Sequence, residues 1–176
     1  MICRTGKDIQ LLLLISLVFT STLVACSLPA DSSLEANFVR HQSDFERLVK
    51  MSNEDRRVVR IANDFTRLED NWNWPRPDAE IGFSKARWDE YRSLFAKLGL
   101  EGGLERGPSG IIYFLVSGRG LATGGDYKGY AYSEVPIPDL YESLDDVGAL
   151  RSALPSLQPA FKKIGDHWYL FYMWDD

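Results

Sequence analysis

The sequence predicts an α+β domain in which two N-terminal helices pack on an antiparallel sheet of hairpins. Apolar residues recur at helical spacing between residues 34 and 98, whereas short apolar or alternating runs, separated by turn residues, follow from residue 111 onward. A length of 176 residues with 45% hydrophobic side chains is enough for one compact core and too little for two large domains.

The first predicted helix runs from residue 32 to residues 51–53. Ser32 and Glu35 have the spacing of a capping box, in which the two residues bind each other's free backbone N–H groups. One face is then apolar at steps of three and four residues: Leu34, Phe38, His41, Phe45 and Leu48. The next apolar run, 58–61, fits either a short strand or one more helical turn.

A second helix is predicted after residues 63–83, which we expect to be irregular because prolines interrupt 71–77. Ser84 provides its N-cap, and Gly99 provides the left-handed residue that ends it. Leu100 is placed for the hydrophobic contact that accompanies such an ending. The apolar side of this helix consists of Trp88, Tyr91, Phe95 and Leu98.

Strand patterns dominate the rest of the chain. The apolar run 111–116 and the alternating run 127–134 are separated by a glycine-rich loop at 118–125, which predicts a hairpin. Weakly helical sequence extends to residue 154. A second hairpin is predicted from 161–164 and 167–174, joined by a tight turn at 165–166.

The last predicted strand is apolar on both faces. Tyr169, Phe171 and Met173 face one way, and the residues that alternate with them are also apolar: Trp168, Leu170, Tyr172 and Trp174. An antiparallel sheet with one face in water normally alternates apolar and polar residues. Three explanations stay open: a strand covered on both sides, a strongly curled sheet, or a second face that meets a partner, another subunit or lipid headgroups.

The N-terminal sequence has the pattern of a secretory leader. Arg4 and Lys7 precede an apolar run whose sixteen positions, 11–26, are too few for a transmembrane helix of about 20 residues. The run ends in Leu23-Val-Ala-Cys26, which resembles the lipobox of bacterial prolipoproteins. This resemblance covers the leader only and leaves the following domain without a family.

The resemblance implies that Cys26 carries a diacylglyceryl group, that residues 1–25 are removed, and that palmitate or a similar acyl chain can modify the new amine. Residues 26–33 are then the lipidated cysteine and a short tether, and 34–176 form the domain. In a Gram-negative source, Ser27 after the cysteine implies the outer membrane, facing the periplasm. Two other interpretations stay open: an unmodified Cys26 after an ordinary cleavage site, and an uncleaved signal anchor.

The net charge, the cysteine count and the motifs argue against several classes of function. A formal net charge of −5 argues against nucleic acid as a partner, since nucleic-acid binding needs a basic surface. Cys3 leaves with the leader and Cys26 carries lipid, so no thiol remains for a disulfide. We predict no catalytic residue, cofactor or metal site: Gly107-Pro-Ser-Gly110 lacks the serine-hydrolase spacing, and His41 and His167 lack metal-ligand spacing.

The sequence therefore favours a lipid-anchored, non-enzymatic binding module of the cell envelope: an inhibitor, an immunity-type protein or an assembly accessory. Its partner would be an envelope protein or a glycan. Trp72, Trp74 and Arg119 are the candidate contacts, because Trp and Arg often anchor interfaces. One alternative is a purely structural lipoprotein. Another is a cell-wall or carbohydrate hydrolase that uses loop carboxylates: Glu69, Asp70, Asp78 and Glu80.

Overall fold

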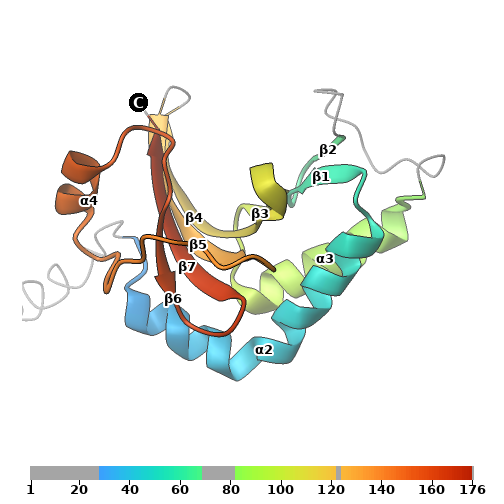
Figure 1. Cartoon of the computed structure of the whole chain (residues 1–176). Helices are drawn as coiled ribbons and strands as arrows, with labels where there is room; N and C mark the ends of the chain where they lie inside the picture. Colours follow the sequence, from blue (N-terminus) through green and yellow to red (C-terminus); the bar gives the residue numbers. More distant parts are fainter. Residues whose placement is uncertain (1–27, 69–81, 122–123, 176) are drawn as a thin grey trace, which may run out of the picture.

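The computed structural model describes residues 28–68, 82–121 and 124–175, and these residues confirm the α+β class. They form three α-helices and one seven-stranded sheet in which neighbouring strands run antiparallel (Figure 1). The strand order across the sheet is β2-β1-β3-β4-β5-β7-β6. In chain order the elements are α2 (Asp31–Glu54), β1 (Val58–Ile61), β2 (Thr66–Leu68), α3 (Lys85–Leu98), β3 (Gly103–Arg106), the 3-10 turn η2 (Pro108–Gly110), β4 (Ile112–Leu121), β5 (Gly124–Tyr132), α4 (Val147–Ala153), β6 (Ala160–Lys163) and β7 (Trp168–Asp175).

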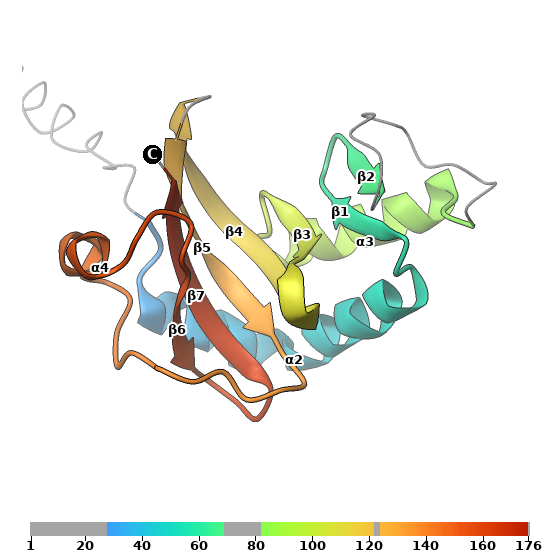
Figure 2. The same ribbon diagram turned by 45° about the horizontal axis from the view of Figure 1, so that its top comes forward.

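Helices α2 and α3 lie along one face of the sheet, which we call the covered face (Figure 1). The sheet is strongly bent, so that β4, β5 and β7 form a curved wall while β1 and β2 splay away at the other end (Figure 2). Among the described residues, the opposite face of the sheet carries no long helix, and we call it the open face. No helix in the described part of the chain has both the length and the apolar character needed to cross a bilayer.

Helix α2 begins at Asp31, three residues before the predicted start of the domain. The predicted capping box is wrong: the N-cap is Ala30, which offers no side-chain cap, and Ser32 and Glu35 lie inside the helix. The backbone N–H of Asp31 donates instead to Oδ1 of Asp145 at 2.9 Å. A distant carboxylate therefore satisfies a helix-start donor that a local side chain was expected to satisfy.

The predicted apolar face of α2 is buried except at one position. The side chain of His41 is 21% exposed, and its backbone (φ −125°, ψ 21°) kinks the helix. The helix ends at Glu54, one residue beyond the predicted range. The buried members of the face are Leu34, Phe38, Phe45 and Leu48.

Both predicted ends of α3 are confirmed. Ser84 Oγ accepts the N–H of Arg87 at 3.1 Å, and Gly99 adopts the left-handed conformation at φ 70°. Leu100 is 1% exposed and its N–H donates to the carbonyl of Phe95, which closes the helix as expected. The segment 58–61 is a strand rather than a helical turn.

The β4–β5 hairpin is confirmed, but the long glycine-rich loop predicted at 118–125 is wrong. Strand β4 continues to Leu121 and β5 starts at Gly124, with Gly118 paired to Tyr127. Strand β7 extends beside this part of β5, and its pairing gives the glycine-rich backbone hydrogen-bond partners on the other side. The C-terminal hairpin of β6 and β7 is confirmed. Strands β2 and β3, of three and four residues, were not predicted.

An aromatic cluster fills the covered face. Phe45 of α2 is fully buried, and its ring lies 4.6 Å from Tyr130, 5.6 Å from Trp168 and 6.0 Å from Phe114. The hydroxyl of Tyr130 donates to the carbonyl of Leu34 at 3.0 Å. This bond joins α2 to β5 and satisfies a buried hydroxyl that would otherwise cost about 1–3 kcal/mol.

An ion cluster lies at the start of α2 on the same face. Lys128 of β5 is 1% exposed, and its Nζ lies 2.8 Å from Asp31 Oδ1 and 2.7 Å from Asp145 Oδ1. Lys162 adds a second ammonium group 3.3 Å from Asp31 Oδ2. Burial raises the pKa of Asp31, but hydrogen bonds from Lys128 and from the N–H of Leu144 outweigh it and hold this pKa below its usual value.

Candidate functional site

The open face of the sheet holds a second, smaller apolar cluster. It consists of Leu115, Ala131, Phe161, Tyr169 and Phe171, with five partly buried hydrophobic residues packed against it. The prediction that β7 is apolar on both faces is confirmed, because Trp168, Leu170 and Tyr172 belong to the covered-face core. Segments on either side of α4 cover part of the open face: the N–H of Ile137, for example, lies 3.3 Å from the hydroxyl of Tyr169.

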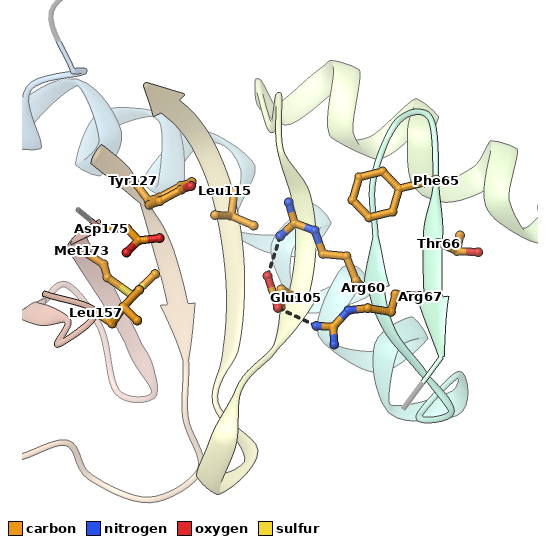
Figure 3. A pocket seen from close by; sticks show the side chains of 10 residues that line it. All are labelled: Arg60, Phe65, Thr66, Arg67, Glu105, Leu115, Tyr127, Leu157, Met173 and Asp175. Carbon is orange, nitrogen blue, oxygen red and sulfur yellow. Dashed lines mark hydrogen bonds and ion pairs between the residues drawn. The ribbon is translucent and has the colours of Figure 1, made fainter. Parts of the chain in front are cut away.

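The rest of the open face is hollowed into a groove, shown in Figure 3. Its main hollow has a volume of about 490 Å³. An adjoining hollow of about 380 Å³ shares Glu105, Leu115, Leu157 and Met173 with it. We refer to the two hollows together as the open-face groove. The main hollow is lined by Arg60, Phe65, Thr66, Arg67, Glu105, Leu115, Tyr127, Leu157, Met173 and Asp175.

Strand pairing explains why this groove forms. Leu115, Tyr127 and Met173 come from β4, β5 and β7, which are neighbours in the sheet and contribute the apolar side of the groove. The polar side comes from β1, β2 and β3, which bend away from those strands (Figure 3). Leu157, in the segment between α4 and β6, stands at the rim with 59% of its surface exposed.

Charged side chains gather at one end of the groove. Glu105 Oε2 lies 2.9 Å from Arg60 Nη1, and Glu105 Oε1 lies 2.8 Å from Arg67 Nη2. The side chain of Arg60 is only 15% exposed, and burial lowers its pKa although Glu105 opposes this shift. Asp175 lies across the groove from this end (Figure 3). The groove therefore offers an apolar floor between a guanidinium pair and a carboxylate.

The described lining residues limit the chemical groups that the groove can offer a ligand. Neither His41 nor His167 lines either hollow, and Tyr113, whose hydroxyl pKa is raised by burial and by Glu105, keeps its proton. In the described part of the chain, no three His, Cys, Asp or Glu side chains gather where a metal ion could sit. The groove can supply apolar contact, guanidinium donors and one carboxylate acceptor.

None of the predicted contact residues has a side chain among those that the structure describes. Cys26, Trp72 and Trp74 lie outside the described residues, as do all four loop carboxylates of the hydrolase alternative. Arg119 lies in β4, where its backbone pairs with Asp126, and its side chain is not among those described.

The residues that line the polar side of the groove were missed. Arg60, Arg67 and Glu105 are 38 to 45 positions apart where they bond, so no sequence spacing connects them. The sequence feature that indicated this face was the last strand, β7, which is apolar on both sides. Comparison of the chain with protein-family models, with curated proteins and with solved structures gave no match to any of them.

Proposed function

We propose that this chain is a lipid-anchored, non-enzymatic binding module of the cell envelope, and that its open-face groove receives a protein partner. The occupant we infer is an apolar side chain of an envelope protein with a carboxylate beside it. The observation that carries the proposal is the open-face groove itself, an apolar hollow of about 490 Å³ with two arginines at one end. This volume lies within the range of about 300–1,000 Å³ that is typical of binding pockets.

Charge complementarity favours a polypeptide over a simple acyl chain. An acyl chain would fill the apolar floor but leave Asp175 without a favourable contact, whereas a polypeptide supplies N–H donors for it. Arg60 and Arg67 both pair with Glu105, and Arg60 can form a further charge-assisted hydrogen bond to an acidic group of the partner. Arginine at such a position is a common interface anchor.

The lipid anchor follows from Leu23-Val-Ala-Cys26, and the fold is compatible with it. Helix α2 begins at Asp31, five residues after Cys26, and five extended residues span about 17 Å. In the mature chain that this implies, α2 and α3 are the two N-terminal helices, packed on the hairpin sheet. The domain would stay close to the membrane, at the outer membrane and facing the periplasm if the source is Gram-negative.

Site-specific photo-crosslinking in the native envelope tests the groove. A photoreactive amino acid at Leu157, on the groove rim, should crosslink one envelope protein, and the captured peptide should place an apolar residue next to Asp or Glu. The same amino acid at Val39, which is 76% exposed on α2, should not capture that protein.

Matched charge variants make the test specific. Arg60→Gln should lower the yield at position 157 by about tenfold, since it removes a charge-assisted contact. Arg57→Gln removes the same charge from an exposed residue outside the groove and should leave the yield unchanged. Capture of a glycan or a lipid, or equal yields for the two variants, would overturn the proposed occupant.

The anchor has a separate test. Cys26→Ser should move the protein from the detergent phase to the aqueous phase in a phase-partition experiment, because about 0.8 kcal/mol per buried methylene is lost with the acyl chains. An unchanged partition, or an unmodified thiol by intact-mass analysis of the native protein, would contradict lipidation without touching the groove.

A further inference from the structure

Another hollow, of about 350 Å³, lies beside β3 and the turn that follows it. Three arginines line it, and no carboxylate does: its residues are Arg56, Val59, Arg67, Arg106, Gly107, Pro108 and Gly110. We call it the arginine hollow. It shares Arg67, Gly107 and Pro108 with the open-face groove, whereas Arg56 and Arg106 line the arginine hollow and neither part of the groove, so the two sites can be tested separately.

Two of these arginines have only neutral partners. Arg56 Nε donates to the backbone carbonyl of Asn53 at 3.2 Å, and Arg106 Nη2 donates to Oδ1 of the same residue at 2.8 Å. Among the described residues, no carboxylate forms an ion pair with either guanidinium group. Arg87 is the contrast within the molecule, because it pairs with three carboxylates: Glu54, Asp55 and Glu90.

The two unpaired cations also act on each other. Burial lowers the pKa of Arg106, and the positive charge of Arg56 lowers it further. Arg106 Nε is buried without a hydrogen-bond partner among the described residues. The native fold therefore holds two guanidinium groups together without a counter-charge, which lowers its stability unless an anion binds there.

Helix α2 compensates only part of this charge. Its carboxyl end, next to Arg56, has an effective negative charge of about 0.5, which is smaller than the positive charge of the two arginines. A phosphate group near neutral pH carries about −1.5 to −2, and guanidinium groups bind its oxygens in a bidentate manner. A carboxylate or a phosphodiester, each with a single negative charge, would leave part of the charge uncompensated.

We infer that the arginine hollow binds a phosphate dianion, either inorganic phosphate or a phosphate monoester. The hollow and Asp31 lie at opposite ends of α2, whose 24 residues span about 36 Å if straight. If the anchor proposed at Cys26 is present, the membrane is tethered at the opposite end of α2, and a phosphate that arrives free in solution or on a partner is the source that we favour. The inference does not depend on the proposed function of the open-face groove.

Calorimetric titration of the full chain in a non-ionic detergent at low ionic strength tests the inference, with inorganic phosphate as the probe. We expect saturable heat from one site. Arg56→Gln and Arg106→Gln should each weaken binding about tenfold, since each removes a hydrogen bond between charged groups. Arg57→Gln, which removes an equal charge from a neighbouring exposed residue, should change the Kd less than twofold.

Folding is controlled within the same series. Arg56 is exposed, so its variant keeps the fold and suffices for the test even if Arg106→Gln unfolds. Absence of saturable heat would overturn the inference, and so would equal weakening by the Arg56 and Arg57 variants, which indicates diffuse attraction. Short-chain phosphatidylglycerol, titrated below its micelle concentration, is the second probe. If it binds as tightly as phosphate, the ligand is a lipid phosphodiester and the assignment of a dianion is wrong.

Discussion

The two faces of the sheet differ in how completely they are closed. On the covered face, helices α2 and α3 bury the aromatic cluster around Phe45, and the buried Tyr130 hydroxyl has a hydrogen-bond partner. On the open face, a smaller apolar cluster stops at the open-face groove, where Leu157 stands exposed. This difference indicates that burial on the covered face stabilises the domain, whereas the open face leaves apolar surface available for contact.

The largest expected effect comes from the centre of the covered face. Phe45→Ala removes a fully buried ring that packs against four other aromatic rings, and should cost about 4 kcal/mol of unfolding free energy. Urea denaturation would measure it, with Val39→Ala on the exposed side of the same helix as the control. A loss of unfolding free energy below about 1 kcal/mol, the typical value for a point substitution, would contradict the conclusion that the covered face stabilises the domain.

The next effect comes from the ion cluster on the covered face. Lys128→Met leaves the buried carboxylate of Asp31 without its nearest cation and should cost about 3 kcal/mol. Adding Asp31→Asn should cost less than the sum of the two single changes, because the carboxylate and the cation are then both absent. Lys163→Met, at an exposed lysine nearby, should change stability by less than about 0.5 kcal/mol.

The third prediction concerns the loss of stability at low pH. The folded pKa of Asp31 is below its usual 3.8, so its contribution to stability is present above that value and is lost as the pH falls through the lowered pKa. The groups that face it are Lys128, Lys162 and Asp145. Urea midpoints measured from neutral pH down to about pH 2 should fall less steeply for Asp31→Asn than for the unmodified chain. Equal slopes would show that another carboxylate dominates acid unfolding.

The smallest effect on stability is expected on the open face. Tyr127→Ala removes a half-buried side chain from the groove and should cost about 1 kcal/mol, because only part of its apolar surface is withdrawn from water. The same change should strongly reduce crosslinking from position 157. A stability loss as large as that of Phe45→Ala would show that the open face is structural and would remove the distinction between the faces.

Local signals explain what the sequence could predict. Ser84 and Gly99 mark the ends of α3 within a few residues of the helix, and alternation along β7 shows its two apolar faces. The start of α2 could not be predicted, since its donor finds Asp145, 114 positions away. Strand β3 has four residues and is defined by its partners β1 and β4 rather than by its own pattern.

The same distinction between local patterns and contacts of distant residues applies to the candidate site. Its apolar floor was indicated by Met173 and Phe171 on the second face of the last strand, which is a pattern within one segment. Its charged end could not be predicted, because Arg60 and Glu105 meet only when β1 pairs with β3. When short strands pair in a sheet, their side chains meet although no regular spacing along the sequence connects them.

The bonds of Asp31 have a mechanical consequence. Asp31 is the first residue of α2, and through Lys128 it is connected to β5, which has strands on both sides. A force that pulls on the chain before Leu28 therefore acts on the middle of the sheet. Part of this force passes through the ion pair of Asp31 with Lys128 rather than through the first helical turn alone. A domain pulled from this end should resist extension through the bonds of Asp31 and through Leu28, which packs against the core beside it.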